Sequence, residues 1–216
     1  MILQTRSENM WRKTETRKMT EVNHFVYEAD LENRGIRITK YTGNADCVQI
    51  PAEIDGAPVV SLGPYVFVEI ADAGKGTFKA VVATNGDTTP REIFLPETLR
   101  YISYCAFYGC ENIICIEIPA AVTEIGSSAF AFCKSLQHIC FPSGLQILNR
   151  SMFRNCSSLQ EVHISGNVKT IGFIAFENCT SLESVILPDS VSEIEMRAFC
   201  GCKSCLLYTS DAADDK

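Results

Sequence analysis

The chain has 216 residues, of which 46% are hydrophobic and 21% charged, and 26 acidic against 19 basic side chains give a net charge of −7. This composition is typical of a globular protein and excludes collagen-like, mucin-like and wholly disordered chains. The negative charge argues against nucleic acid as a partner, and no apolar run approaches the ~20 residues of a membrane-spanning helix.

The first unit along the chain, residues 1–19, is polar and carries five basic and two acidic side chains. Only its first three residues are apolar, so it lacks the apolar stretch of about 7–15 residues that a secretory signal peptide contains. A segment of this composition does not bury enough surface to order itself, and we expect a flexible head.

Residues 20–45 form the second expected unit. The segments FVYEADL (25–31) and IRITKY (36–41) alternate in polarity, and ENRG (32–35) separates them. This pattern predicts a β-hairpin. At the start of a repeat array, such a hairpin would cap the first coil by covering its apolar end and its open strand edge.

The third unit, residues 46–204, contains an internal repeat. From Arg91 to residue 204 the sequence follows blocks of 23 residues without a gap, and a looser copy over 48–67 carries five extra residues within EIDGAP (53–58). Between them, residues 68–90 are expected to form a loop insertion. Loops of that length are usually functional or mobile, and we expect mobility here.

The repeat positions define a core. Positions 3, 5, 9 and 12 of each block are apolar, position 6 is proline in four of the five blocks, and positions 17 and 20 are invariant. Apolar residues two apart predict a short strand with one inward face, which the proline ends. Position 17 is Phe107, Phe130, Phe153, Phe176 and Phe199, and position 20 is Cys110, Cys133, Cys156, Cys179 and Cys202.

These blocks resemble the BspA-like leucine-rich repeats, whose pattern is roughly L-x-x-I-x-I-P-x-x-V-x-x-I-G-x-x-A-F-x-x-C-x-S. The resemblance covers residues 48–204, and the hairpin segment resembles the lead-in of that family. It implies a right-handed leucine-rich-repeat solenoid with short parallel strands and short helical turns. It also implies a bacterial, non-enzymatic module that binds partners at the cell surface or after secretion, although residues 1–19 contain no signal peptide.

The last unit, residues 205–216, breaks the repeat, since Cys205 stands where the other blocks have Ile or Leu. Cys205 to Asp215 resembles the one-frame translation of a transposase-type sequencing adapter. We therefore expect a non-native tail that adds nothing to the fold, and a natural C-terminus that is missing.

The eleven cysteines of the chain outnumber its three histidines. Adjacent coils would bring the position-20 sulfurs about 5 Å apart, a spacing that allows a disulfide or metal ladder to be considered. However, no CxxC pair occurs, and zinc sites use closely spaced ligands. We therefore expect small buried side chains whose thiols meet turn backbone.

Positions 2 and 4 flank the inward residues of each strand, so they are expected to point outward on the concave face. His138, Cys140 and His163 are ligand types that zinc favours, but side chains on a shallow sheet stand parallel instead of converging. A Cys140–His163 nucleophile pair lacks an orienting acid and an enclosed pocket. The candidate binding residues of this face are Glu92, Phe94, Cys115, Glu117, His138, Cys140, Glu161, His163, Ser184 and Ile186.

No sequence motif of catalysis is present, because the chain lacks GxGxxG, P-loop, HExxH and GxSxG patterns. We therefore expect no catalytic residue, no resident metal and no cofactor. The expected function is recognition of a protein or glycan by the concave strand face. Two alternatives stay open, namely a structural spacer within a larger surface protein and a zinc site formed by the face's Cys and His residues.

Overall fold

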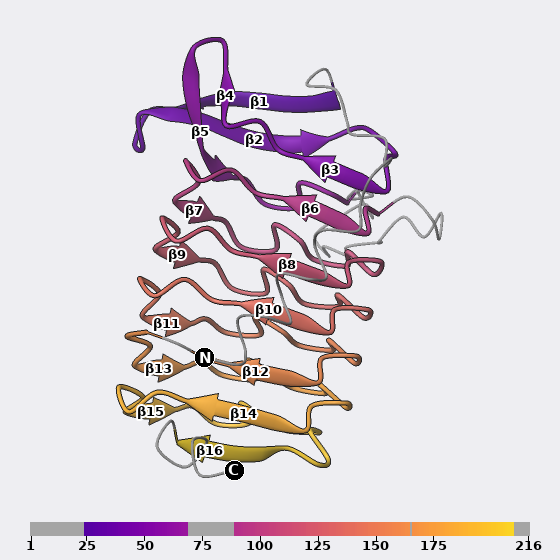
Figure 1. Ribbon diagram of the computed structural model, residues 1–216, viewed down its shortest axis with the longest axis vertical. Helices are drawn as coiled ribbons and strands as arrows, with labels where there is room; N and C mark the ends of the chain where they lie inside the picture. The colour runs from indigo at the N-terminus through magenta and orange to yellow at the C-terminus, as the bar shows by residue number, and fades with distance from the viewer. Residues whose placement is uncertain (1–23, 69–88, 165, 210–216) are drawn as a thin grey trace, which may run out of the picture.

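The computed structural model describes residues 24–68, 89–164 and 166–209, which form a β-solenoid of about seven turns (Figure 1). These residues contain sixteen strands and no helix. The predicted head, nearly all of the predicted loop and the last seven residues of the tail lie outside the described residues.

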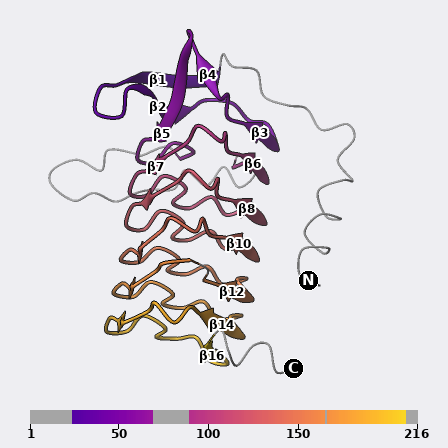
Figure 2. The ribbon, with the colours of Figure 1, turned by 60° about the vertical axis from the view of Figure 1, so that its left-hand side comes forward.

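Positions 2 to 4 of the repeat form the first of two strand ladders, and Figures 1 and 2 show its strands aligned along one side of the stack. Their pairing is parallel, within the groups β3–β6, β8–β10 and β12–β14–β16. The alternation in the sequence predicted this ladder. Its strands are β3 (Cys47–Gln49), β6 (Glu92–Phe94), β8 (Cys115–Glu117), β10 (His138–Cys140), β12 (Glu161–His163), β14 (Ser184–Leu187) and β16 (Leu206–Thr209).

Positions 11 and 12 form a second parallel ladder on the opposite side of the stack (Figure 1). The sequence analysis took position 12 only as an apolar contact, so it missed these strands. Their parallel groups are β2–β5–β7–β9 and β11–β13–β15. The strands are β5 (Ala57–Leu62), β7 (Tyr101–Ile102), β9 (Glu124–Ile125), β11 (Ile147–Leu148), β13 (Thr170–Ile171) and β15 (Glu193–Ile194).

At the N-terminal end, β1 (Phe25–Asp30) pairs antiparallel with β2 (Gly35–Tyr41), and β2 then pairs parallel with β5. The chain therefore contains the antiparallel pair at the predicted place, with β1 as the edge strand; that this pair caps the stack stays a prediction. The five extra residues of the first unit have a structural role as well. They lie at a second antiparallel turn, between β4 (Glu53–Ile54) and β5, where Asp55 and Gly56 both have positive φ.

Asp30 is a buried carboxylate that fixes the β1–β2 turn. It accepts hydrogen bonds from the Asn33 side chain at 2.9 Å and from Ser61 at 2.5 Å, and Arg37 lies 3.2 Å away. Burial raises the pKa of Asp30, but the hydrogen bonds from Asn33 and Ser61 and the charge of Arg37 outweigh it and hold the pKa below its ordinary value. The charged form is therefore the one that the fold stabilises.

The expectation of short helical turns around the Ala-Phe pair is wrong. Each of these turns has two residues in the left-handed region, at positions 15 and 19, as in Ser128 (φ 58°) and Phe132 (φ 64°), and left-handed residues interrupt an α-helix. Backbone N–H groups of the turn donate to the next coil instead of along the chain. Phe107 N–H, for example, bonds to Ala129 O at 2.8 Å, and Gly109 N–H bonds to Ala131 O at 2.9 Å.

Glycine at position 13 is required by a close approach between coils. A Cβ placed on Gly172 would lie 2.8 Å from the backbone N of Arg150, and one on Gly126 would overlap the backbone of Tyr104. Neither glycine is among the residues with positive φ. The sequence analysis assigned these glycines to a turn, whereas the structure shows that they let neighbouring backbones pass.

The position-17 phenylalanines form a continuous stack through the core. Phe107, Phe130, Phe153 and Phe176 are fully buried. Consecutive rings from Phe67 to Phe199 have centroids 5.0–5.5 Å apart and interplanar angles of 3–15°. One aromatic ring per coil therefore packs directly on the next, which confirms that this position belongs to the core.

Part of the tail joins the array, contrary to the expectation that it adds nothing. Leu206–Thr209 form β16, which pairs in parallel register with β14. Leu206 and Leu207 nevertheless remain 58% and 47% exposed, because no described coil follows them. Backbone pairing, more than side-chain burial, holds this strand to the stack.

Candidate binding surface

The outward side chains of the first ladder form the surface that we call the strand face. All ten predicted binding residues lie on β6, β8, β10, β12 and β14. Six of them are exposed, namely Phe94, Glu117, His138, Cys140, Glu161 and His163; the other four, Glu92, Cys115, Ser184 and Ile186, are half-buried. The inward residue of each of these strands is buried, so the alternation runs as predicted.

The parallel register sets the side chains of the strand face in two rows. His138 lies opposite Cys115, and Cys140 lies opposite Glu117. Further along, His163 lies opposite Ile186. In parallel strands such partners stand about 4.8 Å apart, so neighbouring coils present a regular row of side chains.

The strand face is longer than the sequence analysis proposed. β3 adds the exposed Gln49 opposite Phe94, and β16 adds Leu206 and Tyr208 beside Ser184 and Ile186. Gln49 could have been found from the sequence, because the unit at 48–67 had already been aligned with the later blocks. β16 could not, since the tail had been left out of the array.

The strand face is acidic, since Glu92, Glu117 and Glu161 supply its carboxylates and no Lys or Arg occupies its predicted positions. Burial raises the pKa of the Cys115 thiol, and the charge of Glu92 adds to that effect. Burial and the charge of Glu117 likewise raise the pKa of the Cys140 thiol. Both sulfurs are therefore neutral thiols near pH 7, which weakens the case for a nucleophile here.

The geometry does not support the zinc alternative. Across the described part of the chain, no three His, Cys, Asp or Glu side chains come close enough together to hold a metal ion. His138 and His163 lie on separate strands, β10 and β12, that belong to different sheets. Their side chains stand beside each other on the sheet, as expected for outward positions.

The position-20 cysteines have a structural role. The thiols of Cys133, Cys156, Cys179 and Cys202 each donate to the carbonyl of the phenylalanine 26 residues earlier, at 3.0–3.2 Å. Burial raises the pKa of Cys156 to about 12. These thiols are small buried side chains that satisfy turn carbonyls, as the sequence analysis expected.

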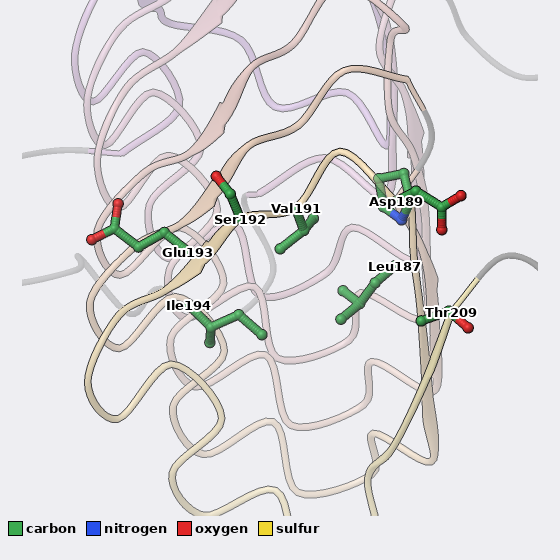
Figure 3. Close-up of a pocket in the computed structure, with 8 residues that line it drawn as sticks. Leu187, Asp189, Val191, Ser192, Glu193, Ile194 and Thr209 are labelled. Atoms are coloured by element: carbon green, nitrogen blue, oxygen red, sulfur yellow. The ribbon is translucent and has the colours of Figure 1, made fainter.

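Two hollows are open on the surface of the stack. The first, of about 310 Å³, lies between β6 and β8 on the strand face. The second, of about 370 Å³, lies at the C-terminal end of the stack. In Figure 3, Leu187, Val191 and Ile194 point into this second hollow, while Asp189 and Glu193 point away from it. It is the apolar surface that a following coil covers in earlier turns, so we do not assign it to the strand face.

Among the described residues there is no helix with the length and apolarity that a membrane crossing requires. No curated protein is similar enough to this chain to count as a match. The sequence of the BspA type leucine-rich repeat region, however, matches residues 86–205 in six copies.

Solved structures give the same assignment. The T. pallidum leucine-rich repeat protein TpLRR is 29% identical, with a TM-score of 0.58 over 88% of this chain and 71% of that one. A leucine-rich cell surface protein from Faecalibacterium prausnitzii is 21% identical, with a TM-score of 0.62 over 91% of this chain and 55% of that one. A leucine-rich repeat protein from Eubacterium ventriosum is 22% identical, with a TM-score of 0.63 over 86% and 46%. The chain thus spans about half the length of the last two, whose likeness shows the fold alone.

The matched repeats cover more than half of the chain, and their invariant Phe and Cys positions are the stacked rings and buried thiols described above. The chain therefore belongs to the BspA-type leucine-rich repeat family.

Proposed function

We propose that this chain is a non-enzymatic binding module that recognises a protein or glycan through the strand face. The observation that carries the proposal is the row of exposed side chains on a rigid ladder, with Phe94 near one end, Ile186 near the other and charged or imidazole groups between them. Mixed apolar and polar groups held in fixed register suit a binding strip better than a solvated surface.

The scaffold supports this role, because strands hold side chains more firmly than loops do. Each strand of the face is anchored by a buried inward residue, and the stacked phenylalanines run behind it. A partner would therefore meet side chains that are already in position, which reduces the entropy lost on binding.

The experiment screens the purified chain against a glycan array and a displayed library of random peptides, and then repeats each hit with two variants. The double variant Phe94→Ala with His163→Ala removes the ends of the charged centre and should abolish binding. Lys134→Ala is the matched control, since Lys134 pairs with Glu111 outside the strand face. If Lys134→Ala abolishes binding while the double variant binds normally, the strand face is the wrong surface.

A spacer without a partner predicts a different outcome. No glycan or peptide would bind, and the strand face would tolerate substitution in the chain's natural setting. That result would replace the binding module by the structural alternative.

A further inference from the structure

This inference rests on the proposed function and concerns the hollow between β6 and β8. The hollow measures about 310 Å³ and is lined by Ile93, Phe94, Leu95, Glu97, Glu117 and Pro119. Its apolar walls are side chains of the core edge, while both carboxylates are on exposed residues. Ligand pockets usually measure about 300–1,000 Å³, so this one suits a single side chain better than a whole small ligand.

The hollow is part of the ladder's construction. β6 and β8 belong to different sheets, whereas β8 and β10 are paired. The backbone hydrogen bond from Ile114 to Arg91, which leads into the β6–β8 gap, is 3.5 Å long, while the equivalent bond from Gln137 to Ile114 is 2.8 Å. The two strands are held less closely here, and the space between their outward side chains stays open.

The chemistry of the lining restricts what can bind. None of the six lining side chains carries a hydrogen-bond donor, because Ile, Phe, Leu and Pro have no polar hydrogen and an ionised Glu only accepts. An anion would meet two like charges, and a sugar would find acceptors but no donors. A ligand that donates without accepting matches this lining.

We propose that this hollow binds an arginine or lysine side chain of an extended, basic polypeptide. The aliphatic stem packs against Ile93, Leu95 and Pro119, as long cationic side chains do on apolar surface. The cationic head donates to Glu97 and Glu117, and the ring of Phe94 offers it a cation–π contact. The remaining carboxylates of the strand face, such as Glu161, favour the same sign of partner.

The probe is a nonapeptide that alternates threonine with arginine and is blocked at both ends. Its matched control replaces every arginine by citrulline, which has the same shape but no charge. Binding is followed by amide chemical shifts of the ¹⁵N-labelled chain. We expect the arginine peptide to shift residues 93–97 and 117, and the citrulline peptide to bind at least about tenfold more weakly, since charge-assisted bonds are about twice as strong as neutral ones.

Three variants locate the site. Glu97→Gln and Glu117→Gln should each weaken binding of the arginine peptide by about two- to fivefold, as expected for an exposed ion pair. Glu161→Gln removes the same charge from the same face outside the hollow and should change the affinity less than twofold. All three residues are exposed, so the urea midpoint should not move.

Equal binding of the arginine and citrulline peptides would overturn cation recognition, and so would equal losses in all three Gln variants. Neither result touches the proposed function, because a strand face that still binds hits from the screen, and loses them with the Phe94 and His163 double variant, remains a binding surface. Shifts by the arginine peptide confined to residues away from the strand face would overturn the site.

Discussion

The stacked phenylalanines allow a sharp test of what holds the solenoid together. Phe153 is fully buried and lies between Phe130, 5.5 Å away at 3°, and Phe176, 5.2 Å away at 15°. Phe141 adds an edge contact at 5.7 Å. Replacing Phe153 by Ala leaves a cavity whose two walls are aromatic rings fixed by their own coils, so the site cannot collapse easily.

Truncation of a buried Phe to Ala costs about 3–5 kcal/mol, and each aromatic pair contributes about 0.5–1.5 kcal/mol beyond burial. With three ring partners lost at once, we expect Phe153→Ala to lower the free energy of unfolding by an amount in the upper half of that range. Urea unfolding followed by circular dichroism measures it.

Phe199→Ala is the matched control, because Phe199 occupies the same repeat position but is only half-buried and stacks on Phe176 alone. Its cost should be about half that of Phe153→Ala or less. A loss below about 1 kcal/mol for Phe153→Ala, or equal losses for the two variants, would refute the account of a continuous aromatic core.

Other features give three further predictions. Ellman's reagent should label the exposed Cys140 of the native chain and should reach Cys156 only after unfolding, because burial raises the pKa of Cys156 to about 12; fast native labelling of both would contradict this. The lowered pKa of Asp30 means that its charge stabilises the fold above about pH 4 and that this contribution is lost as the pH falls through the folded-state value. Asp30→Asn should therefore lower the free energy of unfolding at pH 7 by about 1–3 kcal/mol and flatten its acid dependence, whereas a variant that keeps the wild-type acid profile would exclude this role. Asn155 has a φ of 61°, so Asn155→Val should be about 1–2 kcal/mol less stable than Asn155→Gly, which loses the same side chain without the left-handed penalty; equal midpoints would show that backbone strain is not decisive there.

The sequence predicted the first ladder because its strands leave a record in side chains. Residues such as Ile116 and Ile118 face the core while Cys115 and Glu117 face outward, and this alternation recurs every 23 residues. The same alternation placed the ten residues of the strand face on outward positions. Periodicity of two is a direct consequence of the strand backbone.

The second ladder and the turns were missed for the same physical reason. A two-residue strand such as Tyr101–Ile102 is too short to show alternation, and it is held by backbone bonds to neighbouring coils. The Ala-Phe-x-x-Cys spacing resembles one turn of a helix in sequence. Left-handed residues of ordinary type, such as Ser128 and Ile174, give no warning of the positive φ that replaces that helix.

The hollow between β6 and β8 was also beyond the sequence. Glu97 and Glu117 come from different blocks and different repeat positions, 7 and 4, so no column of the repeat aligns them. Only the stacking of one coil on the next brings them to the same space. Features inside one column are therefore visible in the sequence, and features between columns need the structure.

The contacts between coils also determine how such a chain can change over evolutionary time. Each coil gives its neighbour the same things, namely a ring, a thiol bonded to a carbonyl and backbone pairing in register. Deleting or duplicating 23 residues within the regular blocks therefore rejoins surfaces that already fit, whereas a shift of any other length would break every column beyond it. Duplication of whole coils would lengthen the outer surface in fixed steps while each new strand remained free to carry different side chains.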